Sequence, residues 1–458
     1  MAEKETDKLS SLPEDILLYI LSSLPFKEAA KTCILSKKWL KLWQSTNTVN
    51  NDELEWKNEE ACGAVEVAQR KAFKNFFKIW ITLQKHHHLH HKFTLKVFPP
   101  PNCGDIVGAG VDFAVLDGVK DLKLDFLEHT EECYGHASVE FPRSVYENKK
   151  LHQKLESLEL YSCSLAPGNL TKFEALNDVT LSSIQLTMES VKTLLSTCPW
   201  MESLSLKYCW DLESFDIDKL NLKKLVIHEC LFGWNYIRFE APNLKVFKYC
   251  GLPPESEVKV VAGTIEEADL DLSPMDEFFA CGNELRKFIR DFFAVNVLTV
   301  CSVILQVIHS GDERVRQNPF MWVTHLKMKI QLHIQERHGF LWFLNSCPWL
   351  TKLTIDLEYD NIFPQYEVRY YTDESWKRFI VPICFQRSLR EVEVNGFKGT
   401  RGQFDVCSHL IRSTLILRKL SVNVLNDDDP ARVVRRRSIG WQLHRISKAS
   451  SDLVIIIR

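Results

Sequence analysis

Residues 198–209 read CPWMESLSLKYC, and the apolar spacing inside this stretch recurs along most of the chain. The spacing is an aliphatic residue, two residues, an aliphatic residue, one residue and a third aliphatic residue. Successive side chains of a strand point to opposite faces, so we expect Leu204 and Leu206 to face a core. Ser205 and Lys207 then face the opposite side. A single copy is weak support, because any amphipathic strand produces it.

The same spacing occurs in eleven copies, and their regular separation makes the pattern specific. The middle residues of these copies are Leu122, Leu158, Val179, Leu204, Leu225, Phe247, Leu298, Leu326, Leu353, Val392 and Leu420. From Leu158 to Phe247 the steps are 21, 25, 21 and 22 residues, within the range of about 20–29 that is typical of leucine-rich repeats. A diverged copy at Ile265, Ala268 and Leu270 extends the series by 21, and the later steps of 30, 28, 27, 39 and 28 are less regular. The predicted fold is therefore an α/β solenoid with one parallel strand per repeat on its concave face.

The chain has 14 cysteines, and no CxxC pair that would favour a zinc ribbon or a redox site. Cys163, Cys209 and Cys230 each lie three residues after the last apolar position of a repeat. Leucine-rich repeats commonly place Asn or Cys there, inside the solenoid. We therefore expect buried structural thiols. No secretory signal precedes them, so reduced thiols and a cytoplasmic or nuclear location are expected.

Residues 9–43 read LSSLPEDILLYILSSLPFKEAAKTCILSKKWLKLW and predict three short helices. Ser11 and Glu14 have capping-box spacing at the start of the first helix, and Pro25 ends it. Three such helices cannot bury all of this apolar surface among themselves, so part of it is expected to bind a partner.

This stretch closely resembles an F-box, with Lys38 in place of the more common Arg as the departure in its final segment. The resemblance implies a surface for a Skp-type adaptor and, through that adaptor, a cullin scaffold. The residues that it assigns to the adaptor surface are Leu12, Pro13, Ile16, Leu17, Ile20, Leu21, Leu24, Leu35, Trp39 and Trp43. The alternative is a small helical cap on the repeats.

The rest of the chain resembles a plant-type family that joins an F-box to leucine-rich repeats and a C-terminal FBD region. CPWMESLSLKYC and APNLKVFKYCG resemble its repeats, and SLREVEVNGFKGT with LILRKLSVNV resembles its C-terminal segment. The organisation expected from the sequence is an F-box at 5–50, a helical and strand linker at 51–115, repeats at 116–360, an FBD-like segment with terminal repeats at 361–430, and a basic tail at 431–458.

These features predict a non-catalytic substrate-recognition subunit of an SCF-type ubiquitin ligase, with an unidentified protein as substrate. The residues expected to bind substrate on the outward face of the strands are Glu159, Tyr161, Thr180, Ser205, Lys207 and His228, with Tyr161, Lys207 and His228 preferred. That face could instead be a solvated polar surface, and the loops or the less regular C-terminal third would then bind the substrate. The alternatives in function are a receptor completed by a small molecule, and a repeat scaffold acting outside the ligase.

Several other features favour no chemistry of their own. His86, His87, His88, His90 and His91 are expected in a solvated loop between a helix at 73–83 and a strand at 93–98, not at a metal. No nucleotide-binding or acyl-transfer motif occurs, so no cofactor is expected. The net charge of -3 gives no general preference for nucleic acid, and no nucleic-acid partner is expected.

The most apolar stretch, 292–305, is too short to cross a membrane comfortably, so a buried strand and helix are expected there and no membrane partner. The arginine run at 432–437 is either an import signal or phosphate patch, or a solvated terminus. Ser438 follows three arginines and could be phosphorylated by a basophilic kinase.

Overall fold

A computed structural model describes most of the chain. The described residues are 9, 11–57, 63–84, 91–97, 104–127, 139–142, 145, 147–164, 173–212, 215–218, 221–231, 237–252, 259–261, 265–273, 282–308, 320–332, 334–357 and 381–458. They form two units, residues 1–213 and 214–458. Most of the histidine cluster lies outside the described residues. His91 is described, and it is exposed.

The first unit begins with the predicted short helices. They are α1 (Glu14–Ser23), α2 (Phe26–Lys31), the 3-10 turn η1 (Thr32–Ile34) and α3 (Lys37–Gln44). Ser36 caps α3 by accepting a hydrogen bond from the backbone N–H of Trp39 at 3.4 Å. The expected capping box at Ser11 is wrong, because Pro13 occupies the N-cap position of α1 and has no side-chain acceptor.

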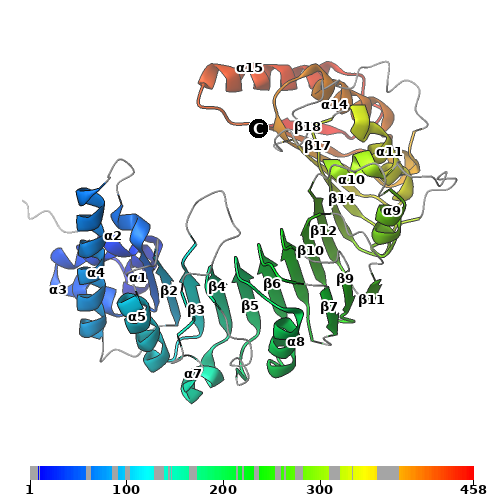
Figure 1. The fold of residues 1–458 in the computed structure, drawn as a ribbon. Coiled ribbons are helices and arrows are strands. Elements are labelled where there is room, and N and C mark those ends of the chain that lie inside the picture. The colour runs from blue at the N-terminus through cyan, green and yellow to red at the C-terminus, as the bar shows by residue number, and fades with distance from the viewer. Residues whose placement is uncertain are drawn as a thin grey trace, which may run out of the picture. The chain divides into compact units, whose positions relative to one another are not determined.

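Parallel strands follow these helices, and each pairs with the next in the sequence (Figure 1). The strands are β1 (Thr48–Asp52), β2 (Lys92–Lys96), β3 (Asp121–Asp125), β4 (Ser157–Tyr161), β5 (Asp178–Ser182) and β6 (Ser203–Lys207). The main helices between them are α4 (Ala64–Gln84), α5 (Gly104–Asp117), α7 (Lys149–Lys154) and α8 (Met188–Thr197). Because β1 and β2 already pair, the sheet begins upstream of residue 116, where the first repeat was predicted.

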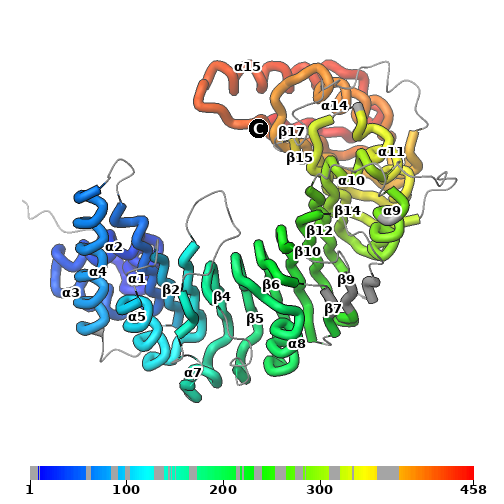
Figure 2. Tube along the Cα trace, in the orientation of Figure 1, coloured from blue at the N-terminus to red at the C-terminus, as the bar shows by residue number. Residues whose placement is uncertain are grey.

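The second unit continues the same construction (Figure 2). Its main strands are β8 (Lys224–His228), β10 (Val246–Gly251), β12 (Glu267–Leu272), β13 (Val297–Cys301), β14 (His325–Lys329), β15 (Lys352–Asp356), β16 (Glu391–Phe397), β17 (Lys419–Val424) and β18 (Val454–Ile457). A second, parallel sheet, not predicted from the sequence, contains β7 (Phe215–Asp218), β9 (Ile237–Glu240) and β11 (Lys259–Val261). The helices are α9 (Gly282–Arg290), α10 (Ser302–Val307), α11 (Arg337–Ser346), α13 (Ile383–Arg387), α14 (Arg401–Ser413) and α15 (Pro430–Trp441).

Two segments of this unit bear on the sequence expectations. Residues 292–305 contain β13 and the first four residues of α10, which confirms the buried strand and helix. Residues 431–458 are not a tail, because α15 and β18 occupy much of this segment. Within the described residues, no helix has the length and apolar character needed to span a membrane.

The predicted repeat core is confirmed. Leu158 pairs in register with Val179, which pairs with Leu204, and in the second unit Leu225 pairs with Phe247. All five side chains are at most 1% exposed. Ala268 pairs with Phe247, so the diverged copy is also a repeat. Burial of these residues at successive strands stabilises the array by roughly 1.5–3 kcal/mol per large aliphatic side chain.

The chain turns sharply after several of these strands. Ser162, Tyr208 and Glu229 have positive φ values of 48–52°, and each immediately precedes one of the predicted cysteines. Cys163, Cys209 and Cys230 are all buried, as expected. The Cys209 thiol donates to the carbonyl of Leu181 at 3.5 Å. Burial raises the pKa of Cys163 to about 12, so this thiol is a structural group rather than a nucleophile.

Candidate functional site

The first candidate site is the helical N-terminal module, whose predicted adaptor residues divide into two groups. Leu17, Leu21, Trp39 and Trp43 are only 0–6% exposed and form the inside of the module. The Trp43 ring lies 5.7 Å from that of Phe26, which also contacts Trp80 of α4 at 5.4 Å. Their assignment to a contact surface was wrong, because side chains buried within the unit have almost no area to offer a partner.

The remaining predicted residues lie at the surface of the module. Ile16 is 47% exposed, Leu24 38% and Leu35 63%. Pro13 is exposed, and Leu12 and Ile20 are half-buried.

Two residues that the sequence reasoning missed belong to the same module. Tyr19 is 72% exposed and Ile34 is 86% exposed. The adjacent apolar pair Ile34–Leu35 was a usable signal, since two neighbours in a short helical turn cannot both face its inner side. The F-box surface is defined as the apolar residues of this module that are exposed or half-buried and named above: Leu12, Pro13, Ile16, Tyr19, Ile20, Leu24, Ile34 and Leu35. An exposed apolar set of this kind favours a protein partner.

The second candidate site is the outward face of the strands, and in the first unit it contains a tight polar cluster. Lys123 Nζ lies 3.0 Å from Glu159 Oε2, and the Tyr161 hydroxyl donates to the same oxygen at 3.1 Å. The Lys123 ammonium also lies 4.5 Å from the centre of the Tyr161 ring. Burial raises the pKa of Glu159, but the hydrogen bond and charge of Lys123 outweigh it and hold that pKa below its ordinary value. Glu159 and Tyr161 are thus held in fixed positions.

The other predicted substrate residues of this unit differ in accessibility. Thr180 and Lys207 are half-buried. Lys207 makes no ion pair with any residue that the structure describes. Ser205 is only 6% exposed, so its assignment to an open binding surface was wrong. Its short side chain, on a strand next to β5, is covered by its surroundings although it points away from the apolar core.

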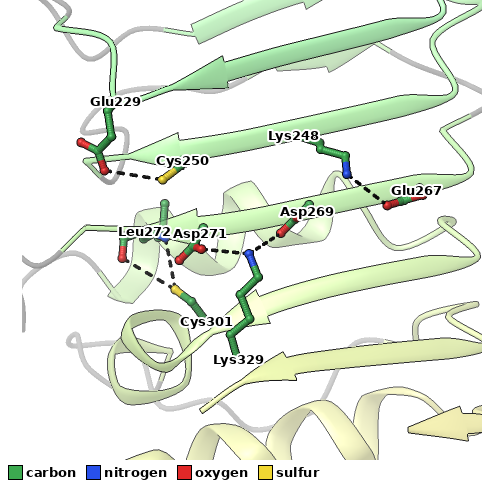
Figure 3. A network of polar contacts seen from close by, with 9 residues as sticks. All are labelled: Glu229, Lys248, Cys250, Glu267, Asp269, Asp271, Leu272, Cys301 and Lys329. Carbon is green, nitrogen blue, oxygen red and sulfur yellow. Dashed lines mark hydrogen bonds and ion pairs between the residues drawn. The ribbon is translucent and has the colours of Figure 1, made fainter. Parts of the chain in front are cut away.

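The outward face of the second unit contains a larger polar network, drawn in Figure 3. Glu229 accepts hydrogen bonds from the Cys250 thiol at 3.5 Å and from Ser273 at 2.6 Å. Lys329 reaches from β14 to two carboxylates of β12, Asp269 at 3.2 Å and Asp271 at 2.9 Å. Nearby, Lys248 and Glu267 form an ion pair at 3.6 Å.

Of the residues predicted to bind substrate, only His228 lies in this region. That residue is half-buried on β8 and pairs in register with Cys250. The sequence pattern did not indicate this network, because Asp269 and Asp271 lie on β12, the strand of the diverged repeat.

His325 and its neighbours continue this face across β14 and β15. Burial lowers the pKa of His325 to about 4, and the nearby charges of Lys352 and Lys327 act in the same direction. The imidazole is therefore neutral near pH 7, and its Nε2 lies 2.9 Å from the Thr354 hydroxyl. Thr354 itself is only 6% exposed.

The chemistry of both faces is that of recognition. Each combines charged and hydroxyl groups already held by neighbouring strands, which suits a protein partner whose polar groups match them. The described residues include no group of His, Cys, Asp and Glu side chains arranged to hold a metal ion.

Comparison with known proteins agrees with this architecture. The F-box domain model matches residues 9–50, and the leucine-rich-repeat domain model described as At1g61320/AtMIF1 matches residues 82–458. The segment 361–430, predicted as FBD-like, falls inside the second match.

Similar proteins from Arabidopsis thaliana cover nearly the same length. The putative F-box/LRR-repeat protein At1g56400 is 28% identical over 89% of this chain and 87% of its own length. The putative F-box/LRR-repeat protein At5g54820 is 29% identical over 89% of this chain and 88% of its own. The F-box protein At3g62230 is 25% identical over 98% of both chains. With its F-box at the N-terminus and its repeats in the matched order, the chain belongs to the plant F-box/leucine-rich-repeat family.

Proposed function

We propose that this chain is the substrate-recognition subunit of an SCF-type ubiquitin ligase. The observation that supports this most is the F-box match at 9–50 together with the exposed apolar residues of the same module. The F-box surface would bind a Skp-type adaptor, and the adaptor would connect the chain to a cullin scaffold. Proteins of this family are typically adaptors without catalytic activity, and the same is proposed here.

The proposed contribution of the chain to ubiquitin transfer is proximity. Substrate held on the repeats would present its lysines to a ubiquitin-charged enzyme at high effective concentration. Ubiquitin transfer would take place in the cytoplasm, the nucleus or both, where thiols such as the buried Cys163 remain reduced.

The strand face is the proposed substrate surface, considered separately in each unit. In the first unit Tyr161 and Lys207 are the preferred contacts, because Tyr161 is held by Glu159 and Lys207 has a charge left for a partner. In the second unit His228 adjoins the network of Glu229 and Cys250. Pre-positioned side chains lose little entropy on binding, which favours affinity.

The adaptor half of the proposal is tested by affinity purification of the full chain from plant cells, followed by quantitative mass spectrometry. The double variant Leu12→Ala/Pro13→Ala should lose the Skp-type adaptor and the cullin while the repeat domain stays folded. Proteins bound to the repeats should be retained and should increase in abundance, since they are no longer ubiquitinated. Undiminished adaptor recovery by the folded variant would contradict the assignment.

The substrate half requires a separate pair of variants. Tyr161→Ala with Lys207→Glu should release the retained proteins and leave adaptor recovery unchanged. The matched control changes an exposed lysine and an exposed aromatic residue elsewhere in the same unit, Lys71→Glu with Trp200→Ala. Equal loss of bound proteins in the test and control double variants, or no loss in either, would show that this face does not bind the substrate.

A further inference from the structure

Helix α15 is firmly held at the C-terminal end of the second unit (Figure 1). The Asp429 side chain caps its first turn by accepting from the N–H of Ala431 at 2.9 Å. Arg436 donates to Asp427 and to the carbonyl of Leu425, both at 2.8 Å. Gly440 lies so close to Ile457 of β18 that an added Cβ would come within 3.1 Å of that side chain. The arginine-rich segment therefore has a fixed helical shape.

The opposite side of α15 faces solvent and is unusual in composition. Val434 is 65% exposed and Trp441 57%, and Arg437 and Ser438 between them are exposed too. These four residues stand at positions i, i+3, i+4 and i+7, so they form one stripe along the helix. The Trp441 ring is fixed by stacking on His444, with ring centres 4.9 Å apart. This stripe is called the α15 face.

The arginines of this segment fall into two groups, those that form ion pairs and those that do not. Arg432 and Arg436 form ion pairs with the aspartates that precede the helix. Arg435, Arg437 and Arg445 are exposed and form no ion pair with any other residue in the described part of the chain. The acidic groups near this region are Asp427, Asp428 and Asp429 at the start of the helix and Asp452 beyond η6 (Gln442–Arg445). Cationic groups therefore lie on and beside the α15 face: Arg437 is part of it, Arg435 follows Val434, and Arg445 follows His444, whose ring stacks on Trp441.

We propose that the α15 face docks an acidic protein segment in which an apolar side chain stands between carboxylates. The carboxylates pair with Arg435, Arg437 and Arg445, and the apolar side chain packs between Val434 and Trp441. Arg and Trp are the residue types most often found at the energetic centre of protein interfaces. A nucleic acid would use the arginines, but its phosphates gain nothing from Val434, so a protein segment fits the face better. This surface is separate from the F-box surface and from the strand face.

The test uses the full chain and fluorescent synthetic peptides, with binding measured by anisotropy. One peptide has several Glu residues around one Leu, the second has Ser for that Leu, and the third has Gln for each Glu. A single-stranded oligonucleotide of equal charge is the fourth probe. Arg435→Glu/Arg437→Glu is compared with Lys287→Glu/Arg290→Glu, which makes the same charge change on exposed residues of α9. Val434→Ser is the apolar variant.

The Glu–Leu peptide should bind best, more weakly as salt rises, and the α15 charge reversal should reduce its affinity about tenfold or more. The α9 reversal should have a much smaller effect. Val434→Ser should weaken the Glu–Leu peptide and leave the Glu–Ser peptide unchanged. The proposal is overturned if the acidic peptides do not bind, if both reversals act equally, or if the oligonucleotide binds more tightly and is indifferent to Val434→Ser. All these positions are exposed, and circular dichroism of each variant confirms that it is folded.

Discussion

Gly339 marks the closest approach between two helices of the second unit, and its substitution by alanine should be strongly destabilising. A Cβ on Gly339 of α11 would overlap backbone atoms of Leu305 in α10. Backbone atoms cannot rotate aside as a side-chain tip can, so the two helices must separate. Leu305 is completely buried, and separation would open the core on both sides of it.

The magnitude follows from two opposing effects. Alanine is favoured over glycine in a helix interior by about 1 kcal/mol. Overpacking of a well-packed core costs about 1–3 kcal/mol when side chains can adjust, and more when they cannot. Because the obstacle at Gly339 is backbone, we expect Gly339→Ala to lower the free energy of unfolding by about 2 kcal/mol or more, net of the helix-propensity gain.

Two glycines of α5 provide matched controls for the same substitution. A Cβ on Gly108 would meet nothing within 4 Å, so Gly108→Ala should stabilise the protein by about 0.5–1 kcal/mol. A Cβ on Gly110 would lie 2.9 Å from the ring tip of Phe77, a side chain with some freedom, so its effect should be intermediate. Denaturant-induced unfolding, followed by circular dichroism, gives the three values. An unchanged or raised stability for Gly339→Ala would refute the packing argument.

Three further predictions concern single groups. His325 has a pKa of about 4 in the fold against 6.5 for the free side chain, so the protein loses stability as the pH falls from 6.5 towards 4. His325→Gln should reduce the loss of stability between pH 7.5 and pH 5 by about 1 kcal/mol, allowing for the partial exposure of the ring. Equal pH dependence of stability in both proteins would show that this residue does not titrate as described. Lys329→Met should lower the free energy of unfolding by about 1–3 kcal/mol, because Asp269 and Asp271 lose a shared cation, and adding Asp271→Asn should recover part of that loss. Cys163 should resist iodoacetamide in the folded protein while the half-buried Cys33 reacts, as mass spectrometry of the labelled peptides would show; rapid labelling of Cys163 would mean that its strand end opens readily.

The repeat core could be predicted from the sequence because it depends on a periodic property. Leu158, Val179 and Leu204 are each placed by their own local pattern, and their stacking follows from equal spacing. The less regular steps after Ala268 did not disturb the sheet, since β13 to β18 still pair in sequence order. The extra residues lie between the strands, some of them in helices such as α11 and α14.

The strands at the ends of the array were harder to predict, for a physical reason. β1 reads TVNND and has little apolar pattern, yet it pairs with β2 along its whole length. β18 reads VIII and follows an arginine-rich helix that the sequence alone suggested was a tail. Terminal strands have a neighbour on one side only, so their sequences are under weaker constraint from packing than those of interior strands.

Site residues were predicted less well than the fold because accessibility depends on tertiary contacts. The same helical stripe in α1 contains the buried Leu17 and the exposed Ile16. Which of them faces inward is decided by α3, which packs against α1, and not by α1 itself. Likewise, Ser205 and Lys207 are equivalent in the alternation of β6, but only the longer side chain reaches solvent.

The most direct test of the central proposal is the dissociation constant between the purified full chain and a purified Skp-type adaptor, measured by calorimetry. Ile34 and Leu35 are 86% and 63% exposed. If a partner buries them, changing both to Ser should cost about 2–4 kcal/mol, or roughly 30-fold to 1000-fold in affinity. Val65→Ser with Val67→Ser, at residues of α4 that are 55% and 69% exposed, is the control and should leave affinity nearly unchanged. We predict tight binding by the native chain that the F-box pair of changes weakens and the α4 pair does not; no measurable binding by the native chain would contradict the assignment to a ubiquitin ligase.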